Sequence, residues 1–156
     1  METLTTADLS SGPVGIDGCS IPVHQFELRQ LALGMARLVD PVDLDRDLAE
    51  ACSQIVEAQL PNAWWVAGTG RPEVEFAAAA GERLITKGGA EGVFMGALVD
   101  RGIGFALKCR DGVMRGADHG ADELLVRLGV YAEHALDREI RNRRNFVAGS
   151  VSVAGD

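Results

Sequence analysis

The chain has 156 residues, 47% of them hydrophobic, which is enough for one domain with a substantial core. Fifteen Lys and Arg residues against twenty-three Asp and Glu residues give a formal charge of −8, which opposes nonspecific binding to nucleic acid or an anionic membrane. We therefore exclude both as partners. Because the N-terminus has no basic and apolar leader and no long apolar stretch follows, we expect a cytoplasmic protein.

The N-terminal residues predict little regular structure. Residues 1–13 are polar and end in Ser10-Ser11-Gly12-Pro13, so we expect a lead-in that does not order itself without a partner surface. A single α+β domain is expected over residues 14–156. It should begin with a short strand at Val14–Ile16, which runs into the tight turn Asp17-Gly18-Cys19-Ser20.

Two helices are predicted next, packed as a helical hairpin. Apolar residues recur at helical spacing from residue 24 to residue 39, and Asp40-Pro41 ends that helix. Asp43 is expected to cap a second amphipathic helix, which ends before Pro61. Residues 64–72, with two tryptophans and two glycines, predict a loop. A short Ala-rich helix over residues 73–80 should follow the loop and end at Gly81.

The second half of the chain predicts a sheet covered by a helix. Segments rich in Val, Ile, Leu and Phe predict strands over residues 83–86, 92–99 and 103–109, with a hairpin turn at Asp100-Arg101-Gly102. A long helix over residues 121–138 should pack on this sheet, and residues 142–156 form a terminal strand or tail. The predicted fold class is therefore α+β: a helical hairpin, then a small antiparallel sheet of about three to five strands with a C-terminal helix packed on it.

Lys87 is the most prominent candidate site residue. It ends a predicted strand directly before Gly88 and Gly89, where the backbone can approach a ligand and the ammonium group is held on a rigid element. Two plainer interpretations stay open: a strand-end lysine that guards a sheet edge, and glycines that supply a bulge or a positive φ. A phosphate-binding P-loop is excluded, because no helix with the required Lys-Ser or Lys-Thr pair follows.

The other polar candidates also have structural alternatives. Asp17 could cap its own turn, and Glu91 could pair with Arg83 or Lys108 across strands. Cys19 could be a buried free thiol. The three cysteines, Cys19, Cys52 and Cys109, are too widely spaced for a disulfide framework or a zinc finger.

Five blocks of the sequence match one known family in order and spacing: Asp17-Gly18-Cys19 and residues 24–38, 66–71, 87–92 and 104–108. With these blocks the chain resembles the rhizobial-type L-asparaginases, often called the asparaginase II family. The resemblance runs from about Gly15 to the C-terminus and corresponds to the C-terminal half of those enzymes. They are similar in fold to serine β-lactamases and penicillin-binding proteins, so the resemblance implies part of a β-lactamase-like fold.

The resemblance also implies a set of site residues. Lys87 matches a strand lysine that faces a Ser-x-x-Lys nucleophile in the N-terminal half, where it accepts a proton or stabilises developing negative charge. Gly88, Gly89 and Glu91 would line the substrate site, and Asp17 would position the substrate ammonium or a zinc-bound water. Cys19 would bind zinc together with a Cys and a Lys of the N-terminal half.

This sequence departs from the family pattern in two ways. It contains no Ser-x-x-Lys, and a family cysteine expected near Glu73 has no counterpart. We therefore expect the C-terminal portion of an amidohydrolase that converts L-asparagine to L-aspartate and ammonia, inactive alone because the nucleophile is missing. Such a chain would be a shortened homologue or one half of a split enzyme.

Two other functions stay open at this stage. The alternative to an enzyme is a noncatalytic binding or assembly protein, which would cover its exposed apolar surface by forming a homo-oligomer. A β-lactamase-like acyl transferase would share the fold, but it too would need a nucleophilic serine.

Overall fold

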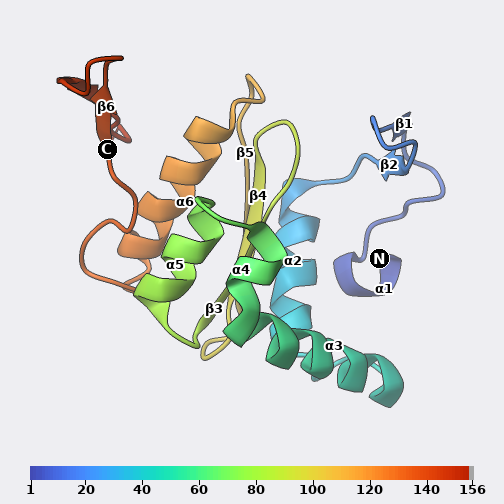
Figure 1. Ribbon diagram of the computed structural model, residues 1–156. Coiled ribbons are helices and arrows are strands. Elements are labelled where there is room, and N and C mark those ends of the chain that lie inside the picture. The colour runs from blue at the N-terminus through green and yellow to red at the C-terminus, as the bar shows by residue number, and fades with distance from the viewer. Residues whose placement is uncertain (155–156) are drawn as a thin grey trace.

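The computed structural model describes residues 1–154 (Figure 1). It confirms the predicted α+β class: a small antiparallel sheet lies among helices, and two short β-hairpins project from the main body. No helix among the described residues is long and apolar enough to cross a membrane. The elements in chain order are α1 (Glu2–Thr5), β1 (Val14–Ile16), β2 (Pro22–His24), α2 (Leu28–Val39), α3 (Arg46–Gln59), the 3-10 helix η1 (Leu60–Asn62), α4 (Ala63–Ala67), α5 (Pro72–Ala80), β3 (Leu84–Gly88), β4 (Val93–Leu98), β5 (Ile103–Lys108), α6 (Met114–Arg127), β6 (Glu139–Arg141) and β7 (Val147–Ser150).

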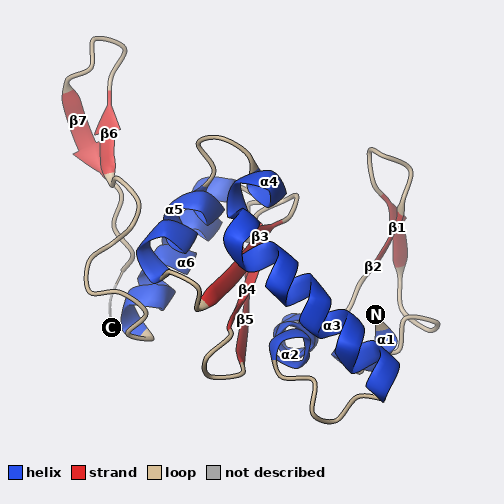
Figure 2. Ribbon diagram, turned by 60° about the horizontal axis from the view of Figure 1, so that its bottom comes forward, coloured by secondary structure: helices blue, strands red, loops and turns tan. Residues whose placement is uncertain are grey.

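The central sheet has the strand order β3-β4-β5, with both pairs antiparallel as predicted. Lys87 pairs with Met95 and Gly88 with Phe94, which fixes the register at the end of β3. Helix α2 lies on one face of the sheet, and α5 and α6 lie on the other (Figures 1 and 2). The sheet therefore has a core on each side, since successive side chains of a strand point to opposite faces.

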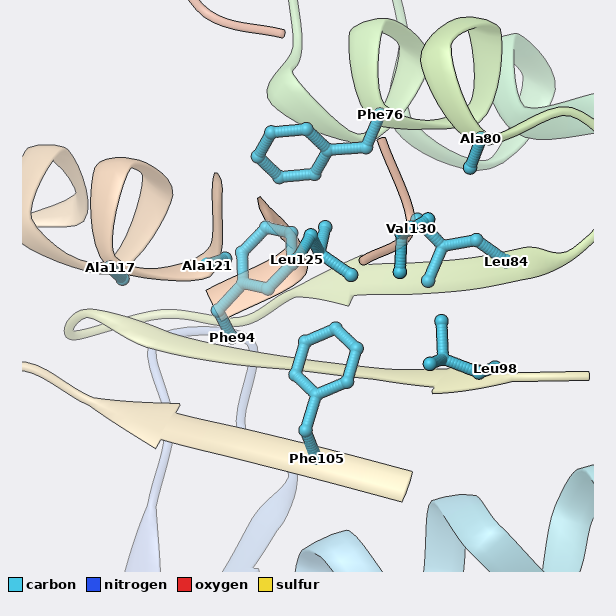
Figure 3. Packing of buried hydrophobic residues seen from close by; sticks show 10 residues of the cluster. All are labelled: Phe76, Ala80, Leu84, Phe94, Leu98, Phe105, Ala117, Ala121, Leu125 and Val130. Atoms are coloured by element: carbon cyan, nitrogen blue, oxygen red, sulfur yellow. The ribbon is translucent and has the colours of Figure 1, made fainter. Parts of the chain in front are cut away.

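The larger core lies between the sheet and helices α5 and α6 (Figure 3). Phe76 of α5 meets Phe94 of β4 edge to face, with ring centroids 5.8 Å apart, an arrangement that aromatic rings favour. Phe105 reaches across β4 because Gly96 has no side chain there; a Cβ on Gly96 would lie 2.5 Å from the Phe105 ring. Buried Leu84, Leu98 and Leu125 close the cluster.

The second core lies on the face that α2 covers. It joins Met35 of α2 and Val56 of α3 to Ile85 and Ala97 of the sheet, so the two helices pack together as predicted. Helix α2 lies very close to β5, because a Cβ on Gly104 would stand only 2.0 Å from the Ala32 carbonyl oxygen. Glycine is the residue type that permits such a close approach of helix and strand.

Several predicted boundaries in the first half are wrong. Helix α2 begins at Leu28 rather than at residue 24, since Pro22–His24 instead pairs with β1. The cap of α3 is Asp45, which accepts a hydrogen bond from the Leu48 amide at 3.0 Å, whereas Asp43 forms an ion pair with Arg37. Helix α4 (Ala63–Ala67) takes up the first part of the loop predicted over residues 64–72.

The N-terminal segment is ordered against α2. Residues Glu2–Thr5 form helix α1, and Thr5 and Ala7 are buried. Arg37 of α2 donates hydrogen bonds to the carbonyl oxygens of Thr3 and Leu4. We expected residues 1–13 to need a partner surface, and α2 of the same chain provides one.

The C-terminal helix is shorter than predicted and lies earlier in the chain. Helix α6 starts at Met114 and ends at Arg127, because Gly129 has a φ of 67° and forms a C-terminal cap. The amides of Gly129 and Val130 donate to the carbonyls of Val126 and Leu125, the hydrogen bonds of a Schellman motif. Residues 130–138, predicted as helix, are instead a loop followed by the hairpin β6–β7.

Asp122 holds this loop against α6. Its fully buried carboxylate accepts hydrogen bonds from the Tyr131 hydroxyl at 2.9 Å, the Ala135 amide at 2.9 Å and the Leu136 amide at 3.3 Å. Burial, together with the Asp122 contact, raises the pKa of Tyr131. Residues 130–138 lack the backbone hydrogen bonds of a helix, and the Asp122 carboxylate accepts two of their amides instead.

Replacing Asp122 should destabilise the fold strongly. We expect Asp122→Ala to lower the free energy of unfolding by about 3 kcal/mol or more, because buried donors lose their acceptor. Tyr131→Phe removes a single donor and should cost about 1 kcal/mol. Urea unfolding followed by circular dichroism measures both values, and equal small losses would contradict the role assigned to Asp122.

Candidate active site

The structure places Lys87 near the end of β3, with its side chain exposed on the sheet face that α2 covers. Lys87 pairs with Met95, and its side chain therefore lies on the same face as Ile85, two residues earlier. Its Nζ donates a hydrogen bond to the Gly88 carbonyl oxygen at 2.6 Å. An ammonium group has three hydrogens, so further acceptors can bind this one.

Side chains bind two backbone groups on the outer edge of β3. The odd-numbered residues of β3 bond to β4, as do the neighbouring pairs Arg83–Val99 and Gly89–Val93, so the polar groups of Thr86 and Gly88 point outward. Gln59 of α3 donates its side-chain amide to the Thr86 carbonyl oxygen at 3.0 Å. Glu73 of α5 accepts the Gly88 amide at 2.8 Å. Two helices therefore bind the strand beside Lys87.

Glu73 is a buried acid that the sequence analysis did not identify as a site residue. Its side chain is 2% exposed, and its second oxygen, Oε2, lies 3.7 Å from Nε of Arg71 with no hydrogen-bond partner among the described residues. The low polarity of α5 indicated a helix that packs on the core, but it did not distinguish Glu73 from Glu75, which is exposed.

Asp118 of α6 belongs to the same electrostatic environment. Its Oδ1 is buried without a hydrogen-bond partner in the part of the chain described. Burial raises the pKa of Asp118; the nearby Arg71 charge lowers this pKa, and the Glu73 charge raises it. The interior behind Gly88 thus contains two acids and one partly exposed arginine.

Gly88 and Gly89 fit their surroundings because they lack side chains. A Cβ on Gly88 would lie 2.8 Å from Oε1 of Glu73, and a Cβ on Gly89 would lie 3.2 Å from Cβ of Val93. Neither glycine has a positive φ, so the alternative that they supply a positive φ is wrong. Close packing explains the glycine pair.

Glu91 lies in the turn that follows. It has a φ of 57°, and its carbonyl oxygen accepts a hydrogen bond from Lys108. Its carboxylate lies beside Gly112, where a Cβ would be 2.8 Å from Oε2. Arg83 instead donates to the carbonyls of Ala80 and Val130, so neither expected carboxylate pairing forms.

Asp17 and Cys19 lie in the turn of the β1–β2 hairpin. Both are exposed, so the buried-thiol alternative for Cys19 is wrong. Asp17 Oδ1 accepts the Gly18 amide at 2.7 Å, and Asp17 Oδ2 lies 4.0 Å from the Cys19 sulfur. The hairpin stands apart from the central sheet in both views (Figures 1 and 2), so the structure keeps this pair separate from Lys87.

The donors present do not make a zinc site by themselves. Cys19 and Asp17 offer suitable atoms, but zinc in proteins normally takes four donors. Residues 1–154 contain no group of three or more His, Cys, Asp or Glu residues that could hold a metal ion.

A cavity opens on the same face of the sheet as Lys87. It has a volume of about 470 Å³, and its walls are residues 24–27, the first turn of α2 and one residue each of β4 and β5. Lys87 lies outside this lining. Its sheet residues, Val93 and Lys108, are cross-strand partners. Val93 is two residues from Met95, the partner of Lys87, so the cavity and the lysine share this end of the sheet.

Comparison with known proteins identifies a family for this chain. The family model described as L-asparaginase II matches residues 1–153. The chain belongs to the L-asparaginase II family. The match includes residues 1–13, which the sequence analysis had left outside the resemblance. No curated protein matches the chain.

The thiols of this family member should differ sharply in reactivity. Cys19 is exposed, whereas Cys52 is 1% exposed and burial raises the pKa of its thiol. We expect a disulfide reagent to modify Cys52 at least about 100-fold more slowly than Cys19. The reagent reacts with the thiolate form, which a raised pKa makes rarer, and the protein shields the Cys52 sulfur from the reagent. Mass mapping of the labelled peptides checks this order, with Cys19→Ser as the control; equal rates would contradict it.

Proposed function

We propose that this chain supplies the lysine-bearing side of an L-asparaginase-type active site. The reaction is hydrolysis of the side-chain amide of L-asparagine to L-aspartate and ammonia. The observation that carries the proposal is the exposed Lys87 ammonium, held at the end of β3 by the Gly88 carbonyl in a member of the L-asparaginase II family. The family acts on a small molecule, and the cavity on that face of the sheet is large enough to hold one.

Lys87 acts on a serine hydroxyl that faces it. The serine oxygen bonds to the amide carbon, the hydroxyl proton passes to the departing nitrogen, and ammonia leaves. Water then adds to the acyl carbon, releases aspartate and restores the serine. Lys87 Nζ moves the proton in its neutral form, or stabilises the negative charge that develops on oxygen in its charged form.

The serine must come from polypeptide outside this sequence. Lys87 and Lys108 are the lysines of the chain, and no serine stands three residues before either of them. We propose that an N-terminal half with a Ser-x-x-Lys motif faces Lys87, and that the chain alone does not hydrolyse asparagine. That half would also bring its Cys and Lys to Cys19 and Asp17.

Exposed apolar side chains favour a second candidate, a noncatalytic homo-oligomer. Trp65 is 79% exposed, and Ile16 and Ile21 in the β1–β2 hairpin are 71% and 61% exposed. Apolar surface of this kind marks contact sites on soluble proteins. A second copy would cover it in this alternative, whereas the N-terminal half covers it in the first.

Ammonia release separates the two candidates. We expect none from the purified chain and release from L-asparagine when the chain is mixed with an N-terminal half of a family member. In that mixture Lys87→Met should lower kcat/KM about 100-fold or more, because a proton-transfer or charge-stabilising group is lost. Arg110→Met, which removes an exposed cation just beyond β5, is the control and should change little.

Light scattering on the same samples completes the experiment. A stable homo-oligomer that gives no ammonia in any mixture would overturn the enzyme proposal. An active mixture with an unchanged Lys87→Met variant would overturn the role of the lysine alone.

A further inference from the structure

We propose that Glu73 is the positioning residue for Lys87. It holds the Gly88 amide, and Gly88 in turn holds the lysine ammonium. The inference rests on the proposed function for its catalytic meaning, but the contacts that carry it belong to this chain alone. Glu73 Oε1 accepts the Gly88 amide at 2.8 Å, and the Gly88 carbonyl accepts Lys87 Nζ at 2.6 Å. The backbone amide of Gly88 thus binds Glu73, and its carbonyl binds Lys87.

Gly88 needs such a restraint. Glycine has more backbone freedom than any other residue, and Gly88 is followed by Gly89 at the end of the strand. Its amide points away from β4, so the sheet does not hold that group. Glu73 binds the N–H of the Lys87–Gly88 peptide, and the carbonyl that accepts Lys87 Nζ belongs to the next peptide, so Glu73 acts on the lysine through the backbone conformation of Gly88.

Burial makes the Glu73 contact strong and directional. Glu73 is 2% exposed, so water does not compete for the Gly88 amide. Hydrogen bonds to carboxylates are roughly twice as strong as those between neutral groups. A Cβ on Gly88 would lie 2.8 Å from Oε1 of Glu73 and 3.4 Å from Nη2 of Arg71, so glycine and acid are matched in shape.

The surroundings of Glu73 favour one orientation of its carboxylate. Arg71 lies on the Oε2 side, 3.7 Å away, and the Gly88 amide binds Oε1. Phe76 on the same helix is fully buried against the sheet, which fixes the helix that carries the acid. The side chain that sets the Gly88 peptide is therefore itself held by packing and charge.

Two substitutions separate positioning from stability. Glu73→Gln keeps an acceptor of the same size without the charge, and Glu73→Ala removes the acceptor. Glu75→Gln is the matched control, because Glu75 lies in the same first turn of α5 but is exposed. Urea unfolding shows whether each variant folds. If Glu73→Ala does not fold, Glu73→Gln is compared with the parent chain in its place.

The first measurement needs no activity. Hydrogen exchange of the Gly88 amide, followed by NMR on the whole chain, should be at least about tenfold faster in Glu73→Ala than in the parent and intermediate in Glu73→Gln. The Lys87 side-chain resonances should shift with it, and Glu75→Gln should match the parent. Unchanged Gly88 exchange in a folded Glu73→Ala chain would overturn the proposal.

The second measurement uses the chain completed with an N-terminal half. Glu73→Ala should lower kcat about tenfold or more with KM changed less than twofold, and Glu73→Gln should recover part of the loss. A change confined to KM would overturn the positioning role. Failure of the completed parent to release ammonia would count against the proposed function, while Gly88 exchange would still decide the role of Glu73.

Discussion

The close contact between helix α2 and strand β5 sets the arrangement of the other elements. A Cβ on Gly104 would lie 2.0 Å from the Ala32 carbonyl, so the helix rests directly on the strand backbone. With α2 on that face, its partner α3 reaches β3 and places Gln59 at the Thr86 carbonyl. The opposite face is left to α5 and α6, which bring Glu73 and Asp118 behind Gly88. Both sides of the lysine strand thus depend on one contact that requires glycine.

Local patterns in the sequence predicted much of this fold. Apolar runs identified the three central strands, and the turn at residues 100–102 identified the pairing of the last two. The ends of the helices were harder to predict. Asp43 and Asp45 are equally good caps by type, and the ion pair of Asp43 with Arg37 is visible only in three dimensions. Tyr131 continued the helical spacing of α6, although Gly129 and the buried Asp122 end the helix before it.

The candidate site also contains residues that local motifs predict and residues that they do not. Lys87 with its two glycines is a local motif, and the family resemblance identified it together with Asp17 and Cys19. Glu73 bonds to a residue fifteen positions away, and nothing in the local sequence of α5 shows which strand it meets. The exposure of Cys19 also depends on how the β1–β2 hairpin projects from the body (Figure 2). Local motifs therefore pointed to Lys87 as a candidate, whereas Glu73, which bonds to the strand beside it, becomes visible only in three dimensions.

The satisfied edge of β3 limits how any other polypeptide can approach Lys87. An open strand edge usually invites a neighbouring chain to extend the sheet through its own main-chain hydrogen bonds. Here Gln59 already binds the outward carbonyl of Thr86, and Glu73 binds the outward amide of Gly88. A strand that paired with this end of β3 would have to displace both side chains. The same two residues also protect the folded chain from edge-to-edge aggregation.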